Sequence, residues 1–283
     1  MFAAEKLLTM GLPEEAAVFD ERECMLYALG TGFAQDPVNE AELAFTYERS
    51  LKVSPSTVTV ICMGTDWVSP TGADPTGVLH GEQRLEFHKA IRAGQRVRHA
   101  SRIVEVVDKG AGKGVILSLE TSVRDEATGE LLCTAITSAF CRRNGGVGGD
   151  ARTRFALHAL PERAPDRTVA RQTQPNQGLF YRLCGDRNPL HAEPDFARRA
   201  GFPRPILHGM CTYGFACRAV LEAWCDYDPA RMASFDARFS SPVYPGETIV
   251  TETWRDGNIV SFRCRVAERD VVVLNNGRAA LRG

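Results

Sequence analysis

The feature that most constrains the fold of this chain is an internal repeat. Segments 27–30 (Tyr-Ala-Leu-Gly) and 79–81 (Leu-His-Gly) return, in degraded form, as 181–185 (Tyr-Arg-Leu-Cys-Gly) and 207–209 (Leu-His-Gly). After each Leu-His-Gly come a helix-like segment, a glycine followed by a polar residue, and several strand-like runs. The repeat therefore predicts two similar halves in one chain.

The boundary between the halves shows in the composition. Residues 144–178 contain five glycines and three prolines but few apolar residues, which is typical of a linker. We therefore predict a first repeat at 1–143, a linker at 144–178 and a second repeat at 179–283. A chain of 283 residues with 44% hydrophobic content can bury one large core or two fused smaller ones.

The periodicity of each half indicates an α+β fold. After Gly209, apolar or small residues recur three and four positions apart, as on one face of a helix. They are Met210, Tyr213, Gly214, Cys217, Val220, Leu221 and Trp224. Apolar residues alternate with polar ones over 115–123 and 260–266, which predicts strands, and Asp256-Gly257 predicts a hairpin turn before the second. A long helix with antiparallel strands, present twice, predicts sheets wrapped around central helices.

Charge and hydropathy argue against two classes of partner. The formal net charge is −1, so the chain has no general basic field that would attract nucleic acid or anionic lipid. The sequence contains no apolar run approaching the length of a membrane span. We expect neither a nucleic-acid partner nor a membrane association.

The cysteines and the ends of the chain suggest a cytoplasmic location. The nine cysteines are odd in number, lack a Cys-x-x-Cys pair and lie mostly in apolar runs, as expected of reduced thiols. The first residues are too charged for a signal peptide, and the last four, Ala-Leu-Arg-Gly, do not form a peroxisomal address. We expect a cytoplasmic protein without disulfides.

The most informative local motif runs from Tyr181 to His191. It places Asp186 and His191 at the two ends of a six-residue turn, where a carboxylate and an imidazole can hold one water. Gly185 allows a backbone conformation that side chains forbid, and Asn188-Pro189 marks a turn. Asn188 either orients the water or bonds to its own backbone, and both roles are compatible.

Other interpretations of this pair are weaker. An isolated carboxylate and imidazole at this spacing usually form a plain surface turn. A metal site needs further ligands, and the six histidines are scattered along the sequence. Hydrolysis by a serine nucleophile would require an elbow of the Gly-x-Ser-x-Gly type, which the sequence lacks.

Gly209 begins the apolar-striped helix and has two possible roles. Its backbone N–H lies where unpaired amides and the positive end of the helix dipole collect, so it can stabilise a developing oxyanion. Alternatively, a glycine here only allows close packing of the helix against a sheet. The residues alone leave this choice open.

The whole chain resembles the hydratase 2 family of (R)-specific enoyl-CoA hydratases, which are related to MaoC-like dehydratases and to the hydratase part of peroxisomal multifunctional enzyme type 2. The family signature Tyr-x-Leu-x-Gly-Asp-x-Asn-Pro-x-His is matched from Tyr181 to His191. Further matching stretches are 19–30, 48–55, 79–83, 206–209 and 242–246. The resemblance implies a double hotdog fold, in which one chain supplies what smaller relatives build as a dimer.

The resemblance also implies roles for particular residues. Asp186, His191 and Asn188 would be catalytic, with Gly209 as the backbone donor to the oxyanion. The expected substrate contacts are His80, Gly81, Lys109, Arg187, Pro189, Leu190 and Phe239. Arg187 departs from the family, whose members often carry a bulky apolar residue there. The first half has no equivalent of Asp186 or His191, so we expect it to accommodate the acyl chain without catalysing.

The expected activity is the reversible (R)-specific hydration of trans-2-enoyl-CoA to (3R)-3-hydroxyacyl-CoA, in the β-oxidation of fatty acids or steroid side chains. We expect no metal and no cofactor apart from the coenzyme A of the substrate. The sequence lacks a Gly-x-Gly-x-x-Gly dinucleotide motif, so a separate 3-hydroxyacyl-CoA dehydrogenase would act next. Relatives in which the two halves are fused in one chain suggest that this protein is a homodimer. The alternatives are a hotdog acyl-CoA thioesterase and a non-catalytic acyl-CoA binding or scaffold subunit.

Overall fold

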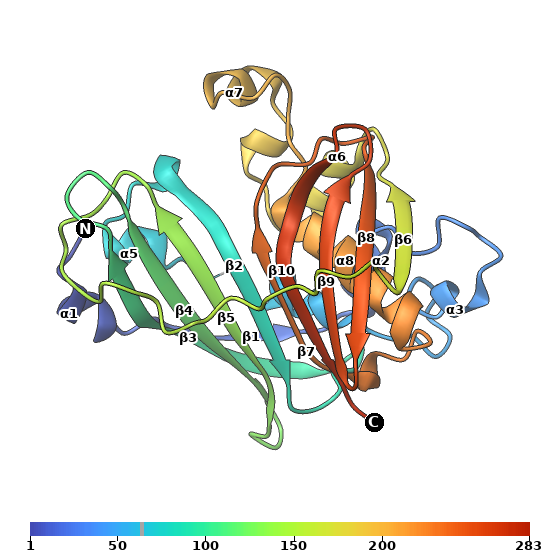
Figure 1. Cartoon of the computed structure of the whole chain (residues 1–283). Coiled ribbons are helices and arrows are strands. Elements are labelled where there is room, and N and C mark those ends of the chain that lie inside the picture. The colour runs from blue at the N-terminus through green and yellow to red at the C-terminus, as the bar shows by residue number, and fades with distance from the viewer. Residues whose placement is uncertain (63–64) are drawn as a thin grey trace.

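A computed structural model describes residues 1–62 and 65–283 and contains one continuous ten-stranded antiparallel sheet (Figure 1). The strand order is β1-β3-β4-β5-β2-β7-β10-β9-β8-β6. The strands of the first half are β1 Glu14–Val18, β2 Val78–Phe87, β3 Arg96–Asp108, β4 Val115–Asp125 and β5 Leu131–Cys141. Those of the second half are β6 Arg167–Gln172, β7 Met232–Phe239, β8 Thr248–Asp256, β9 Ile259–Val266 and β10 Val271–Leu281.

The repeat is real at the level of topology. Within the first half the sheet order is β1-β3-β4-β5-β2, and the second half repeats it as β6-β8-β9-β10-β7. The halves are joined where β2 pairs antiparallel with β7, from Glu82 opposite Arg238 to Glu86 opposite Ser234. The sheet therefore has no edge at the junction, because the last strand of each unit supplies the hydrogen bonds that the other would leave open.

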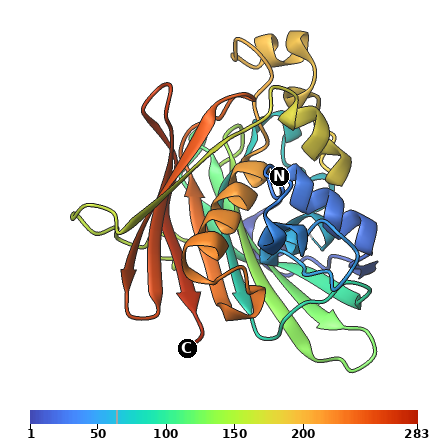
Figure 2. The same ribbon diagram turned by 90° about the vertical axis from the view of Figure 1, so that its right-hand side faces the viewer.

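The helices lie together on one side of this sheet (Figure 2). They are α1 Ala4–Leu8, α2 Glu21–Gly30, α3 Glu40–Leu43, α4 Val58–Ile61, α5 Val68–Thr71, α6 Gln177–Tyr181, α7 Pro194–Arg199 and α8 Gly209–Trp224. Short 3₁₀ turns are η1 Pro55–Thr57, η2 Pro75–Gly77, η3 Arg182–Cys184, η4 Pro189–His191 and η5 Pro229–Arg231. The largest buried cluster contains residues from Phe19 to Leu281, so both halves share one main core.

The second half has the expected long central helix, and the first half does not. Helix α8 runs for 16 residues, and it is buried on nearly all sides rather than along one stripe. In the corresponding part of the first half, the described residues form the shorter helices α2 to α5 and two 3₁₀ turns, η1 and η2. The first half therefore surrounds its sheet with separate short pieces, between which space is left.

Several predictions from periodicity are confirmed. The α+β class and the double hotdog arrangement are present, β4 and β9 cover the two alternating runs, and Asp256-Gly257 lies at the turn between β8 and β9. Gly257 has a φ of 63°, which the turn requires. No helix of the described residues is long and apolar enough to span a bilayer.

Two predictions about the repeat are wrong in detail. Leu79-His80-Gly81 does not begin a helix, since all three residues lie in β2, which corresponds by topology to β7 and not to α8. The match of three residues, Leu-His-Gly, indicates secondary structure less reliably than the pattern of the ten residues of β2 around it. The predicted linker also contains β6, which pairs with β8, so the sheet of the second half begins before residue 179. The rest of that segment crosses the outer face of the sheet, as the yellow-green trace in Figure 1 shows.

Candidate active site

The turn that carries Asp186 and His191 is organised by its own backbone. Gly185 has a φ of 138°, which side chains rarely tolerate. The Asp186 carboxylate accepts the Asn188 N–H at 3.0 Å, and the Asn188 side-chain oxygen accepts the Leu190 N–H at 3.0 Å. These two bonds lead into the 3₁₀ turn η4, which ends at His191. These bonds fix the conformation of the turn between Asp186 and His191.

The His191 ring is held in one tautomer. Its Nδ1 lies 2.9 Å from the main-chain oxygen of Ile206, and since a carbonyl only accepts, Nδ1 carries the proton in the neutral ring. Nε2 is then left with a lone pair, as a general base requires. Burial lowers the pKa of His191 below its usual value, although the Ile206 bond and the negative charge of Asp186 act in the opposite direction.

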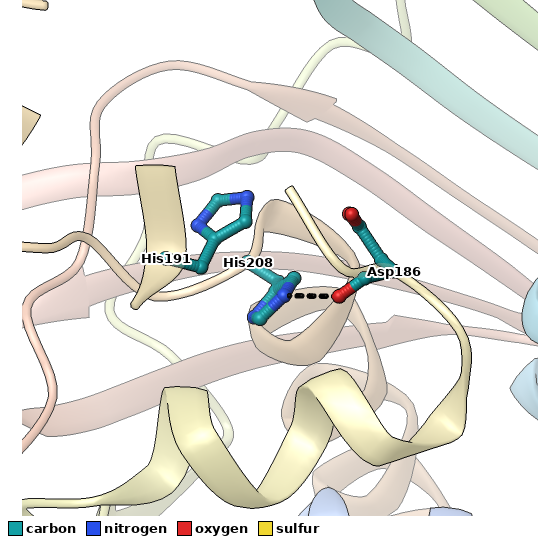
Figure 3. A group of neighbouring side chains, drawn as sticks. All are labelled: Asp186, His191 and His208. Carbon is teal, nitrogen blue, oxygen red and sulfur yellow. Dashed lines mark hydrogen bonds between the residues drawn. The ribbon is translucent and has the colours of Figure 1, made fainter. Parts of the chain in front are cut away.

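The structure adds His208, which the sequence analysis did not place in the site. Its ring stacks on that of His191, with centroids 3.8 Å apart and planes inclined by 29°. His208 Nε2 donates to the main-chain oxygen of Asp186 at 3.1 Å, the bond drawn in Figure 3. Burial and the neighbouring His191 lower the pKa of His208 to about 4, so its ring is neutral near pH 7.

Asp186, His191 and His208 form one cluster. One carboxylate oxygen of Asp186 and one ring nitrogen of each histidine all lie within 4.8 Å of one another. Two hydrogen bonds of about 2.6–3.2 Å can bridge such a distance through one water. The histidines are scattered along the sequence, but His191 and His208 meet in space. Position 208 carried one signal, its place beside Gly209 in the repeated Leu-His-Gly.

Gly209 is the first residue of α8, as predicted. The residue before it, His208, makes no side-chain cap, and the Gly209 N–H has no hydrogen-bond partner among residues 1–62 and 65–283. A Cβ at Gly209 would lie 3.1 Å from Cε1 of Phe239, which is tighter than ordinary contact. Both interpretations thus have support, since the amide is free to donate and the helix end also packs closely on β7.

His80, Gly81 and Phe239 lie near this helix end. The His80 and Phe239 rings pack with centroids 4.7 Å apart. Burial lowers the pKa of His80 to about 4, and its Nε2 is buried without a partner among the described residues. Gly81 occupies a bulge between β2 and β5, where a Cβ would lie 3.2 Å from the Ser138 carbonyl oxygen. These three residues therefore lie together beside the start of α8, and their contact with substrate stays a prediction.

A cavity of about 360 Å³ adjoins the cluster. Asp186, Gly185, Cys184, Tyr181 and Met210 line it from the second half. Most of its wall comes from the first half, where the residues are Thr59, Val60, Thr65, Trp67, Val78, His80, Gln83, Ser101, Leu119, Thr121, Thr137 and Ala139. The cavity therefore lies between the first half and the turn that carries Asp186, and it reaches the Asp186 side chain.

The remaining predicted contacts are not among the residues that line this cavity. Lys109 is exposed in the turn between β3 and β4, and Arg187 is exposed on the motif turn. Pro189 and Leu190 are half-buried in η4, where they shape the turn. Phe239 lies behind His80 and Gly209 rather than on the cavity wall.

Comparison with known families matches both halves. Residues 18–143 match the family described as the MFE-2 hydratase 2 N-terminal domain, and residues 157–276 match the MaoC like domain. The two matches divide the chain near the place where the linker crosses the sheet.

Individual relatives cover nearly the whole chain. The peroxisomal enoyl-CoA hydratase 2 of Arabidopsis thaliana is 38% identical over 96% of this chain and 94% of its own length. The peroxisomal hydratase-dehydrogenase-epimerase of Neurospora crassa is 36% identical over 93% of this chain but only 30% of its own length. The crystal structure of a MaoC-like dehydratase from Phytophthora capsici superposes with a TM-score of 0.88, at 32% identity and 98% coverage of both chains.

Proposed function

The chain belongs to the hydratase 2 family of MaoC-like dehydratases, and we propose that Asp186 and His191 perform its chemistry on one shared water. The enzyme is a hydro-lyase that hydrates trans-2-enoyl-CoA with R specificity to (3R)-3-hydroxyacyl-CoA, a reversible step of β-oxidation. The observation that carries the proposed mechanism is the distance of at most 4.8 Å between the carboxylate oxygen and the imidazole nitrogen.

In this mechanism the water lies between the Asp186 carboxylate and His191 Nε2. Its oxygen bonds to C3 of the enoyl group, one of its protons passes to the pair, and a proton from the pair goes to C2. The two residues act as a coupled unit, because both contact the same water. Asn188 supports this arrangement by fixing the turn through its bond to the Leu190 N–H.

The negative charge that develops on the thioester oxygen needs a donor. The Gly209 N–H is free and lies at the positive end of the 16-residue helix α8, so we assign it this role. Neutral His80 and Gly81 would contact the thioester portion, and Lys109, Arg187, Pro189 and Leu190 would contact more exposed parts of the ligand. The first half would accommodate the acyl group, of a fatty acid or a steroid side chain, in the cavity that opens beside Asp186.

Two substitutions test the catalytic pair. Asp186→Asn and His191→Ala should each lower kcat for a trans-2-enoyl-CoA by about 10²–10⁴-fold, since each removes a group that transfers protons in the transition state. Asp195→Asn is a matched control, because this carboxylate is exposed in α7 and pairs with Arg198. Unchanged far-UV circular dichroism would show that the fold persists. Full activity in either Asp186→Asn or His191→Ala would refute the assignment.

The same assay separates the two rival functions. Hydration removes the enoyl absorbance and leaves the thioester intact, whereas a thioesterase would release free coenzyme A thiol. A binding or scaffold subunit would bind the ester without either change and would keep this property in Asp186→Asn. Chiral analysis of the product then checks the R configuration.

We further propose that no metal or redox cofactor takes part and that coenzyme A enters only with the substrate. In support, an Asp carboxylate and a His imidazole suffice for the proton transfers of the proposed step. Asp186, His191 and His208 lie close enough together to hold a metal ion, so the proposal calls for a direct test. Dialysis against a strong chelator should leave kcat unchanged. A loss restored by a divalent cation would contradict this proposal.

Assembly and location are also proposals. A homodimer is supported by three exposed leucines, Leu29 on α2, Leu179 on α6 and Leu183 on η3. These three elements contact one another, so the leucines belong to one region of the surface. Light scattering of the purified protein gives the mass directly, and Leu179→Glu should reduce it. We propose that a separate 3-hydroxyacyl-CoA dehydrogenase acts next; in support, the name of the Neurospora relative includes a dehydrogenase, and that relative extends well beyond this chain. Nine unpaired cysteines are compatible with the cytoplasm, which cell fractionation can test.

A further inference from the structure

His208 carries a buried ring nitrogen that the proposed mechanism does not use. The residue is 1% exposed, and its Nε2 donates to the main-chain oxygen of Asp186 at 3.1 Å. In the neutral ring the lone pair therefore lies on Nδ1. Nδ1 is buried and has no hydrogen-bond partner among residues 1–62 and 65–283. A buried acceptor without a partner is costly, so such an atom beside a functional site points to a ligand.

The neighbouring histidine, His191, has a matching arrangement. Its Nδ1 lies 2.9 Å from the main-chain oxygen of Ile206, which leaves the lone pair on Nε2. Each of the two histidines thus donates one N–H to a main-chain carbonyl and keeps a lone pair on its other nitrogen. Histidines that bind metals in proteins almost always have this arrangement, because the carbonyl fixes the tautomer and the orientation of the ring.

The third group beside these rings is the Asp186 carboxylate, which supplies a negative charge. One of its oxygens and one ring nitrogen of each histidine all lie within 4.8 Å of one another, and Figure 3 draws the three side chains together. In the part of the chain that the structure describes, no other group of three or more His, Cys, Asp or Glu side chains has this proximity.

Two nitrogens and one oxygen form a ligand set that suits Zn²⁺. Zinc sites with three protein ligands keep a fourth position for water, whereas Mg²⁺ and Ca²⁺ prefer six or more oxygen ligands. Zinc bonds of about 2.1 Å place tetrahedral ligand atoms about 3.4 Å apart, so the longest separation here must shorten by about 1.4 Å. Asp186 is exposed and lines the cavity, so its carboxylate has room to rotate and the ion has a path to the site.

We propose that Asp186, His191 and His208 form a Zn²⁺ site whose occupation inhibits the enzyme. The ion takes the Asp186 oxygen and the His191 Nε2 lone pair that the proposed mechanism uses for the water, so neither group transfers a proton while the ion is bound. The metal-free protein is then the active form. The inhibition rests on the proposed hydratase function, but the binding of the ion does not.

The experiment starts from wild-type enzyme that has been treated with a strong chelator and returned to metal-free buffer. Calorimetric titration with Zn²⁺ should show one ion bound per chain. In parallel, kcat for a trans-2-enoyl-CoA should fall as the site fills, by about 10²–10⁴-fold at saturation, which is the loss expected when the proton-transferring groups are blocked. Fresh chelator should restore the rate. Mg²⁺ should neither bind nor inhibit, because the site offers too few oxygens.

Two variants assign the ligands. His208→Phe removes the ring nitrogens but keeps a flat ring against His191 and Tyr181. It should weaken Zn²⁺ binding by more than about 100-fold, since even the loss of an outer partner of a metal ligand costs about 10–100-fold. Asp186→Asn should weaken binding as well, because a neutral amide replaces the charged ligand. Calorimetry measures both effects without any need for catalytic activity.

His99→Phe is the matched control. His99 is 3% exposed on β3, and its Nδ1 also has no partner among the described residues, but it lies outside the group of three. This variant should bind Zn²⁺ with wild-type affinity. If His208→Phe does not fold, Asp186→Asn still decides the question, because it changes an exposed side chain.

The outcomes separate this inference from the function beside which it stands. If wild-type enzyme binds no Zn²⁺, or if His208→Phe and Asp186→Asn bind it as tightly as wild type, the site is refuted. If Zn²⁺ binds there and kcat stays the same or rises, its inhibitory role is refuted. If the metal-free enzyme hydrates no enoyl-CoA, the proposed function fails, while calorimetry still decides whether the three residues bind the ion.

Discussion

At the scale of single residues, the site depends on how main-chain atoms hold each functional group. Ile206 fixes the tautomer of His191, the Asn188 N–H orients the Asp186 carboxylate, and His208 bonds to the main chain of Asp186. Each bond uses a backbone group, whose position follows from the fold and not from a flexible side chain. The proposed water site is therefore preorganised before substrate arrives.

The protonation of His191 can be measured directly. Burial disfavours the charged imidazolium, so His191 should bind its second proton only at a pH below about 6.5. The charge of Asp186 partly opposes this effect, and Asp186→Asn should therefore lower the pKa of His191 further. Titration of the His191 ring by NMR gives both values. A midpoint above 6.5 in the wild type, or a rise in Asp186→Asn, would contradict the electrostatic account.

The two roles of Gly209 can be separated by substitutions that share one Cβ. Gly209→Ala keeps the N–H and brings a Cβ toward Phe239, whereas Gly209→Pro brings the same Cβ and removes the N–H. Proline suits the first position of a helix, and His208 already has the extended φ of −56° and ψ of 133° that a following proline favours.

If the N–H stabilises the oxyanion, the proline variant should have a kcat about 10²–10³-fold below that of the alanine variant. Thermal melting should show the two variants to be of similar stability. Equal kcat values would leave close packing against Phe239 as the role of this glycine.

At the scale of elements, a buried ion pair attaches the short helix α3 to the central helix α8. Arg218 of α8 donates to Glu42 of α3, and both side chains are 1% exposed. Glu42 also accepts from the Tyr227 hydroxyl and the Ala34 N–H, each at 2.8 Å. The pair therefore fixes one of the short helices of the first half against the long helix of the second half.

Glu42→Gln should lower the free energy of unfolding by about 3–5 kcal/mol, because it removes the buried counter-charge of Arg218 and leaves it the partly exposed Glu222 carboxylate at 3.9 Å. The double variant Glu42→Leu/Arg218→Met should recover most of this loss, since a buried ion pair can often be replaced by apolar side chains. Urea denaturation gives both values. A Glu42→Gln variant as stable as the wild type would show that the pair is dispensable.

At the scale of the whole molecule, the two repeats form one structural unit. The sheet is continuous through β2 and β7, and a single main cluster contains Phe19, Tyr27 and Val97 of the first half with Phe235 and Leu281 of the second. Neither half covers its own core, because α8 packs among elements of both.

The protein should therefore unfold in a single transition, although the sequence shows two repeats. Calorimetry should give equal calorimetric and van't Hoff enthalpies. Two separate transitions, or a soluble and folded fragment 1–143, would show that the halves are independent.

Some features follow from the sequence because they are local. The turn at Asp186 is specified by Gly185, Asn188 and Pro189 within a few residues, and the length of α8 follows from its three-and-four spacing. Strands β4 and β9 follow from alternation with period two. The family resemblance covered both halves for the same reason, since its motifs are short continuous stretches.

Other features depend on contacts between distant parts of the chain, which a local pattern does not contain. His208 joins the cluster because the start of α8 packs beside η4, and the cavity forms where residues of β2 to β5 meet the segment from Tyr181 to Asp186. The sequence alone determined the turn, the central helix and the alternation of the strands, through backbone geometry and hydrophobic period. Only the tertiary structure decided which imidazole stacks on His191 and which side chains line the cavity, because packing sets those distances.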